Sequence, residues 1–138
     1  MREIKFRFWD KENKKMIYGA EETYDYGASG VPIMEDNFGL LLKNSGEYVM
    51  QFVGVKDKNG KDVYEGDIIK KKEEYNKRTH DALYKIKYVG TGFYLELITS
   101  YAVVNSGVVM SFPYGAYYVV GNIYENPELL EMSKWLNL

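Results

Sequence analysis

Apolar residues recur with a period of two in three separate runs of this chain. In the first run apolar side chains flank Lys5 and Arg7, and in the second they flank Lys85 and Lys87. The apolar members are Ile4, Phe6 and Phe8, then Tyr84, Ile86 and Tyr88, then Phe93, Leu95 and Leu97. Because successive side chains of a strand point to opposite faces, this period predicts strands with one buried and one wet face. The 14 tyrosines also fit a pleated surface, so we expect a mainly β fold.

Turn residues separate the predicted strands. Asn59-Gly60 lies between two strand-like segments, and this dipeptide favours a two-residue hairpin in which both central residues have positive φ. Residues 53–56 and 62–70 are therefore expected to lie next to each other. The polar stretch 10–14 indicates a second hairpin near the amino terminus.

The order of these signals predicts a single domain, residues 1–138, built around a small, partly open, SH3-like β-barrel. The barrel-like core is placed at residues 48–124. Its central strands are expected at 48–55 and 117–120, which are apolar on both faces. Residues 1–47 supply an amino-terminal hairpin and a variable loop. The charged segment 73–81 has no clear period and is expected to be a loop.

A carboxyl-terminal helix is predicted over residues 126–136. Asn126 can cap its amino end, Pro127 suits the first helical position, and Glu128 lies near the positive end of the helix dipole. The apolar residues at helical spacing are Leu129, Met132 and Leu136. Such a face is expected to pack across one end of the barrel.

The chain has no cysteine and one histidine, His80. Disulfides, thiolate zinc sites, thiol nucleophiles and multi-histidine metal sites are therefore excluded. We expect no catalytic residue, no metal and no cofactor, and the composition leans away from an enzyme. The absence of cysteine is typical of a reducing compartment, and no stretch is apolar enough to span a bilayer, so we expect a cytoplasmic protein that contacts no membrane.

Three blocks of the sequence resemble the YopX family. They are residues 1–10 (MREIKFRFWD), residues 51–61 (QFVGVKDKNGK) continuing into 63–69 (VYEGDII), and residues 120–130 (VGNIYENPELL). The resemblance implies a small protein of bacteriophages and prophages, mostly of Gram-positive hosts, that acts in the host cytoplasm. It implies no biochemical activity. Residues 19–47 and 73–81 match no block, so features particular to this chain are expected there.

Two polar clusters within these blocks are candidate binding positions. They are Tyr64, Glu65, Gly66 and Asp67 in the middle block, and Asn122 and Tyr124 in the last. Glu65 and Asp67 share a face if the chain is extended, and paired carboxylates can do acid–base chemistry or hold a hard cation. The structural alternative, which we favour, is that Gly66 forms a bend and Asp67 hydrogen-bonds the nearby backbone. Asn122, Tyr124 and Asn126 could likewise hydrogen-bond a ligand, but strand exit followed by helix capping explains Asn126 fully and the other two adequately.

A basic cluster is the strongest nucleic-acid signal in the chain. Its members are Lys70, Lys71, Lys72, Lys77 and Arg78. The nearby Tyr84, Tyr88 and Tyr94 would supply stacking platforms beside it, as in grooves that track a nucleic-acid backbone. Glu73 and Glu74 interrupt the cluster, and lysines on edge strands also guard against aggregation, which is the structural alternative.

Two classes of function follow. The preferred one is an interaction module, a tyrosine-rich β domain that forms a homo-oligomer or binds a host or phage protein through aromatic surface and strand edges. The alternative is a nucleic-acid-binding accessory factor that uses residues 70–78 and weakens steeply with salt. The formal net charge of -2 disfavours nucleic acid. A hydrolase built on Glu65 and Asp67 ranks last.

Overall fold

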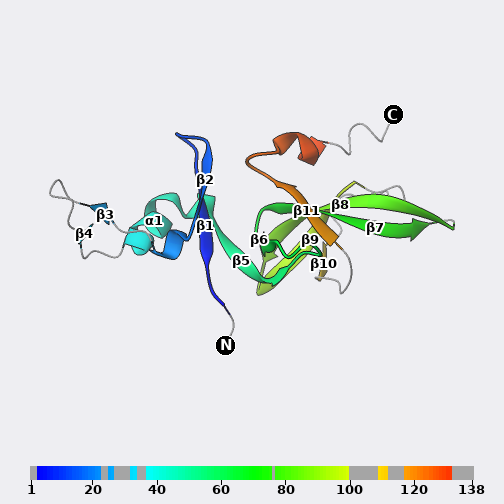
Figure 1. Cartoon of the computed structure of the whole chain (residues 1–138), viewed down its shortest axis with the longest axis horizontal. Helices are drawn as coiled ribbons and strands as arrows, with labels where there is room; N and C mark the ends of the chain where they lie inside the picture. Colours follow the sequence, from blue (N-terminus) through cyan, green and yellow to red (C-terminus); the bar gives the residue numbers. More distant parts are fainter. Residues whose placement is uncertain are drawn as a thin grey trace. The chain divides into compact units, whose positions relative to one another are not determined.

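The computed structural model describes residues 3–22, 25–26, 32–33, 37–75, 77–99, 109–111 and 117–131. The chain divides into two compact units, residues 1–52 and 53–138, which are described separately. Antiparallel strands dominate the described residues (Figure 1), so the predicted mainly β fold is confirmed. Folding of the two units as a single cooperative domain stays a prediction.

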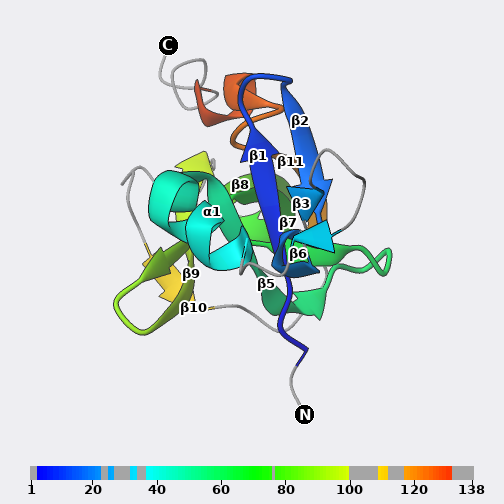
Figure 2. The ribbon, with the colours of Figure 1, turned by 90° about the vertical axis from the view of Figure 1, so that its left-hand side faces the viewer.

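The first unit is built around an amino-terminal hairpin. Its elements are β1 (Phe6–Asp10), β2 (Lys15–Tyr18), η1 (Ala20–Glu22), β3 (Asp25–Tyr26), β4 (Pro32–Ile33), α1 (Asn37–Ser45), η2 (Gly46–Tyr48) and the first half of β5 (Val49–Lys56). Strand β1 pairs antiparallel with β2 on one side, as Figure 2 shows, and with the start of β5 on the other. The predicted hairpin around residues 10–14 is therefore confirmed.

The burial of β1 differs from the prediction. Arg7, expected on the wet face, is only 2% exposed, whereas Ile4, expected on the buried face, is 56% exposed. Ile4 lies before the strand begins. Within the strand, Arg7 is buried on one face, and on the other the ring of Phe38 from α1 packs 4.8 Å from that of Phe6. Both faces of β1 are covered, so the period of two does not separate buried from wet residues.

The second unit holds a five-stranded antiparallel sheet in the order β10-β9-β8-β7-β11, which forms a half-barrel. Its elements are β6 (Asp62–Tyr64), β7 (Asp67–Tyr75), β8 (Arg78–Val89), β9 (Gly92–Thr99), β10 (Val109–Ser111), β11 (Tyr117–Asn122) and η3 (Pro127–Glu131). Strand β6 pairs with β5 across the turn at residues 57–61, which confirms the predicted proximity of 53–56 and 62–70. The half-barrel confirms the barrel-like character of the predicted core.

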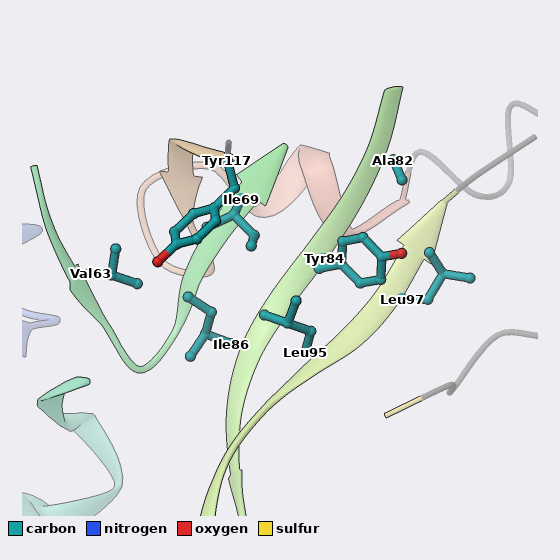
Figure 3. Close-up of a cluster of buried hydrophobic side chains, with 8 residues drawn as sticks. All are labelled: Val63, Ile69, Ala82, Tyr84, Ile86, Leu95, Leu97 and Tyr117. Carbon is teal, nitrogen blue, oxygen red and sulfur yellow. The ribbon is translucent and has the colours of Figure 1, made fainter. Parts of the chain in front are cut away.

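Each face of this sheet carries its own hydrophobic cluster. The larger one, drawn in Figure 3, contains Val63, Ile69, Ala82, Tyr84, Ile86, Leu95, Leu97 and Tyr117. Ile86 lies opposite Leu95 in the β8–β9 register, as the alternation in both runs predicts. The smaller cluster, Ile68, Leu83 and Ile98, is packed against Leu129 and Leu130 of η3. Because neighbours along a strand point to opposite faces, Ile68 and Ile69 fill different clusters.

Two predictions about this sheet are wrong. Residues 117–120, predicted as a central strand, lie in the edge strand β11. The segment 73–81, predicted as a loop, continues β7 and β8 as a ribbon in which Lys72 lies opposite Asp81. On the face that carries Lys72 and Asp81 the described side chains are exposed, so no apolar period marks the ribbon, although backbone pairing continues.

The turn at Asn59-Gly60 also differs from the prediction. Of the two residues Asn59 and Gly60, only Gly60 has a positive φ, of 82°. The Gly60 N–H donates to the carbonyl of Asp57 at 3.0 Å, and the Asp57 N–H donates to the carbonyl of Lys61 at 2.8 Å. This is a three-residue hairpin loop with glycine in the left-handed position. The Asp57 carboxylate, which accepts the N–H groups of Asn59 and Lys61 at 2.9 Å, favours this longer loop.

The predicted carboxyl-terminal helix is not confirmed as an α-helix in the residues that the structure describes. Pro127–Glu131 form the 3-10 helix η3 in place of α-helical turns, and the Leu129 N–H donates to the Asn126 carbonyl at 3.1 Å. Residues 132–136 of the predicted helix lie outside the described residues.

Candidate functional site

The turn between β6 and β7 holds the first candidate cluster. Gly66 has a φ of 85°, which glycine adopts without strain, and its N–H donates to the Ile86 carbonyl at 2.9 Å. Asp67 is 1% exposed, and its Oδ2 accepts the N–H of Tyr64 at 2.8 Å. These are the contacts that the structural alternative requires. A binding role for Tyr64, Glu65, Gly66 and Asp67 stays a prediction.

The structure brings the second candidate cluster next to the first. Asn122 of β11 lies opposite Asp67 in the β7–β11 register. One residue later, the Ile123 N–H donates to the Gly66 carbonyl at 2.9 Å. The two clusters, separate in the sequence, are therefore held together by backbone pairing.

Asn122 organises the turn after β11. Its side chain is buried, and Oδ1 accepts the N–H groups of Tyr124 at 3.0 Å and Glu125 at 2.8 Å. The Asn122 N–H in turn donates to Oδ1 of Asn126 at 3.2 Å. A Cβ added at Gly121 would lie 2.5 Å from that oxygen, so this turn has no room for a side chain there.

The chemistry available to this joint site is restricted by burial. The Asp67 carboxylate is 1% exposed and accepts a backbone N–H, so it does not face dissolved substrate as a general base must. Among the residues that the structure describes, no group of three or more histidine, cysteine, aspartate or glutamate side chains is arranged to hold a metal ion. The geometry therefore suits turn formation better than hydrolysis.

Asp57 is a key residue that the sequence analysis did not single out. Its Oδ1 accepts the two turn N–H groups described above, and its Oδ2 accepts the N–H of Val119 in β11 at 3.0 Å. The Lys58 N–H donates to the carbonyl of Tyr117 at 3.1 Å. The β5–β6 turn is thereby fastened to the outer edge of β11. The available sequence signal was an aspartate opening the turn, as Asp10 does in the first hairpin.

Burial and hydrogen bonding shift the pKa of Asp57 in opposite directions. Burial alone raises the pKa of its carboxyl, but the N–H groups of Val119, Lys61 and Asn59 outweigh burial and hold the pKa below its ordinary value. The pKa of Tyr117 is raised, first by burial and then by the negative charge of Asp57. Asp57 is therefore a buried, ionised anchor between the turn and β11.

The structure does not gather the predicted basic cluster on one surface. Because residues alternate along β7, Lys70 and Lys72 point to one face and Lys71 to the other. Lys77, with a φ of 63°, and Arg78 are exposed at the ribbon's turn. A role in nucleic-acid binding stays a prediction.

The tyrosines expected to stack on bases are also divided. Tyr84 is 2% exposed and belongs to the larger hydrophobic cluster, which corrects its prediction as an exposed platform. Tyr88 is 51% exposed, and Tyr94 is half-buried. On the face that carries Tyr94, Glu96 lies 2.8 Å from the Lys87 ammonium and 3.6 Å from that of Lys85. The hydrogen bond from Lys87 is the main cause of the lowered Glu96 pKa.

An aromatic surface lies at the end of the β8–β9 hairpin. Across the two strands, Tyr84 lies opposite Leu97, Ile86 opposite Leu95 and Tyr88 opposite Phe93. We call these six residues the β8–β9 stripe. Its first four members are buried, whereas Tyr88 is 51% exposed and meets the half-buried Phe93 edge-on, with ring centroids 5.3 Å apart. The apolar stripe therefore continues from the core to the surface.

The hairpin turn keeps this surface in place. Val89 pairs with Gly92, so the turn has two residues, and Gly90 at its first position has a φ of 61°. That is the position at which a tight hairpin requires glycine. Val89, which is 39% exposed, points to the opposite face of the hairpin from Tyr88.

Comparison with known proteins gives a family and a similar structure. The family described as YopX protein matches residues 5–131 of the chain. The crystal structure of protein EF1440 from Enterococcus faecalis is 28% identical, with a TM-score of 0.55, over 95% of this chain and 100% of that chain. No curated protein matches. Within the described ranges, no helix has the length and apolar character needed to cross a bilayer.

Proposed function

The chain belongs to the YopX family, and we propose that it is a phage- or prophage-encoded protein of the bacterial cytoplasm that works as a protein-interaction module. The observation that carries this proposal is the exposed end of the β8–β9 stripe. Tyr88, half-exposed beside Phe93, extends the buried core onto the surface. The bacterial source of the similar EF1440 structure is consistent with the proposed setting.

The physical case rests on rigidity and composition. Tyrosine is enriched among residues that dominate binding energy at interfaces, because it offers large area with few rotatable bonds. Here the ring of Tyr88 is already positioned by Phe93 and by a tight two-residue turn. Little conformational entropy is therefore lost when a partner covers it.

The test compares two tyrosines of matched exposure. Tyr88 is 51% exposed in the second unit, and Tyr18 is 56% exposed in the first. Tagged wild-type protein, Tyr88→Ser and Tyr18→Ser are used to retain proteins from lysates of the host, with and without phage. A partner retained by wild type and Tyr18→Ser but lost with Tyr88→Ser supports the proposal. Equal retention by all three proteins contradicts the assignment to the stripe.

Nucleic acid is the alternative ligand, and the same preparations test it. The division of Lys70–Lys72 between two faces and the pairing of Lys85 and Lys87 with Glu96 support it less well. Size-exclusion chromatography with light scattering at low and high salt, with absorbance recorded for nucleic acid, separates the two functions. Nucleic acid that copurifies and is released by salt would favour the alternative over the interaction module.

Two finer features of the fold belong to the same proposal. We expect the half-barrel to have SH3-like strand connections and the carboxyl-terminal helix to reach residue 136. The start of η3 at Pro127 supports the second expectation. Backbone NMR shifts for residues 132–136 test it, and extended rather than helical shifts would contradict it.

A further inference from the structure

The β5–β6 turn contains the one Asn-Gly dipeptide of the sequence, Asn59-Gly60, and both residues are exposed. An asparagine followed by glycine forms a succinimide readily, because no side chain on the glycine hinders the approach of its nitrogen. The Gly60 nitrogen loses its proton and bonds to Cγ of the Asn59 side chain. The bond from Cγ to the side-chain nitrogen breaks, and that nitrogen leaves as ammonia with the proton. Water then opens the ring to aspartate or to isoaspartate, in which the main chain runs through the side-chain carbons.

The folded turn opposes this reaction at the nitrogen that attacks. The Gly60 N–H donates to the Asp57 carbonyl at 3.0 Å. Because the succinimide nitrogen has no hydrogen, ring closure must break this bond. Gly60 also lies between Asn59 and Lys61, whose N–H groups both donate to Oδ1 of Asp57 at 2.9 Å. Negative charge on the Gly60 nitrogen is therefore opposed by a carboxylate that is ionised at neutral pH.

From this geometry we infer that Asn59 is a modification site, converted by water to aspartate or isoaspartate, and that Asp57 protects it while the turn stays fastened to β11. The first hairpin provides a contrast within the same chain. Asn13 donates through its side-chain amide to Oδ2 of Asp10 at 2.7 Å and is followed by Lys14. The side chain of Lys14 hinders its nitrogen, so we expect conversion at residue 59 and not at residue 13.

Conversion weakens the same contacts that prevent it. Either product adds a carboxylate to the turn, two residues after that of Asp57, and like charges repel. Isoaspartate also adds a carbon atom to the main chain between the N–H groups of residues 59 and 61, which share one oxygen of Asp57. The other oxygen accepts the Val119 N–H at 3.0 Å, so a displaced Asp57 releases β11 as well. Conversion therefore marks molecules in which the anchor has opened, and it keeps the anchor open.

The test compares the full chain of wild type, Asp57→Ala and Leu95→Ala, each incubated under native conditions at neutral pH. Intact mass and peptide mapping locate the conversion, and enzymatic methylation counts isoaspartate. Leu95→Ala creates a cavity in the larger hydrophobic cluster, so it lowers stability without removing a contact of the turn. Loss of the hydrogen bonds and charge of Asp57 should make Asp57→Ala convert at residue 59 about tenfold faster than wild type. Leu95→Ala should convert at a rate close to that of wild type.

Three results would each overturn the inference. They are a folded wild type that converts as fast as wild type unfolded in urea, an Asp57→Ala variant that converts no faster than Leu95→Ala, and conversion at Asn13 as fast as at Asn59. Circular dichroism checks that each variant is folded. If Asp57→Ala is unfolded, Asp57→Asn takes its place, with an expected rate between those of wild type and the unfolded chain.

Hydrogen exchange tests the effect on β11. Converted wild type is separated by ion exchange, because the new carboxylate changes its charge. Its Val119 N–H should exchange about tenfold faster than in unconverted protein, since the acceptor at Asp57 is no longer fixed. Unchanged exchange at Val119 would overturn the release of β11.

Discussion

Replacing Asp57 tests the anchor between the β5–β6 turn and β11. Asp57→Ala removes the acceptor for the N–H groups of Asn59, Lys61 and Val119. Hydrogen bonds to a charged group contribute about 1.5–3 kcal/mol each. Asn59 and Lys61 are exposed, so water replaces much of what their N–H groups lose. The Val119 N–H loses its partner more completely, and we expect the free energy of unfolding to fall by about 2–4 kcal/mol.

Asp57→Asn separates charge from shape. The asparagine has one carbonyl oxygen, which can accept hydrogen bonds either from the turn N–H groups or from the Val119 N–H. Its NH2 group then faces the remaining N–H, which cannot accept a hydrogen bond. The expected loss is roughly half that of Asp57→Ala. Asp62→Asn is the control in the same hairpin, where the Lys56–Asp62 ion pair lies at the surface and contributes about 0.2–1 kcal/mol.

The sign of the pH dependence follows from the lowered pKa of Asp57. The folded-state pKa lies below the ordinary value of 3.8, so the ionised carboxylate stabilises the fold above that value. This contribution is lost as the pH falls from there through the folded-state pKa. The pKa values of Asp10 and Glu96 are lowered too, by Asn13 and Lys87 respectively. Those two groups are present in both proteins, so the difference between wild type and Asp57→Asn isolates Asp57.

Urea denaturation followed by circular dichroism, at neutral pH and in steps down through the ordinary pKa, measures both effects. The stability difference between wild type and Asp57→Asn should shrink as the solution becomes more acidic. Two results would refute the assignment of Asp57 as an ionised anchor. One is an Asp57→Ala variant whose free energy of unfolding falls no further than that of the Asp62→Asn control. The other is a stability difference between wild type and Asp57→Asn that does not change with pH.

Two further substitutions test particular contacts. Gly121→Ala places a Cβ 2.5 Å from Asn126 Oδ1, and overpacking of this kind should cost about 1–3 kcal/mol. Thermal unfolding measures the loss, and adding Asn126→Ala should make the alanine at 121 less costly; strict additivity would contradict the clash. Glu96→Gln weakens the contacts with Lys85 and Lys87, so we expect a loss of about 0.2–1 kcal/mol at low salt that fades at high salt. A loss that is independent of salt would rule out an ionic origin.

Local patterns predicted the sheet where one face is covered and the other is wet. Ile86 and Leu95 are buried opposite each other, as their alternation with charged neighbours indicates. The pattern was misleading where that condition does not hold. Arg7 is buried because both faces of β1 are covered, and the ribbon that pairs Lys72 with Asp81 has exposed side chains on the face that carries these two residues. An apolar period of two indicates that the two faces of a strand differ in burial. It does not detect a strand whose faces are equally buried or equally exposed.

Asp10 and Asp57 show why the candidate site was only partly predictable. Each opens a hairpin turn and accepts two backbone N–H groups of that turn through Oδ1. This part is local chemistry that an aspartate before a turn indicates. The second oxygen differs: in Asp10 it accepts the side chain of Asn13, whereas in Asp57 it reaches Val119, 62 residues away. No local signal distinguishes the two aspartates, because that difference exists only once β11 is in place.

The residues that carry the family resemblance differ from those proposed to bind a partner. Gly66 bonds to Ile123, and Asp67 lies opposite Asn122, so residues of the middle and last blocks meet in one joint of the second unit. We expect a chain with these blocks to form the same backbone contacts, whichever partner it binds. The proposed contact surface at Tyr88 lies outside the blocks. Relatives that share these backbone contacts can therefore differ in what they bind, and a substitution at Tyr88 should change association while leaving the fold unchanged.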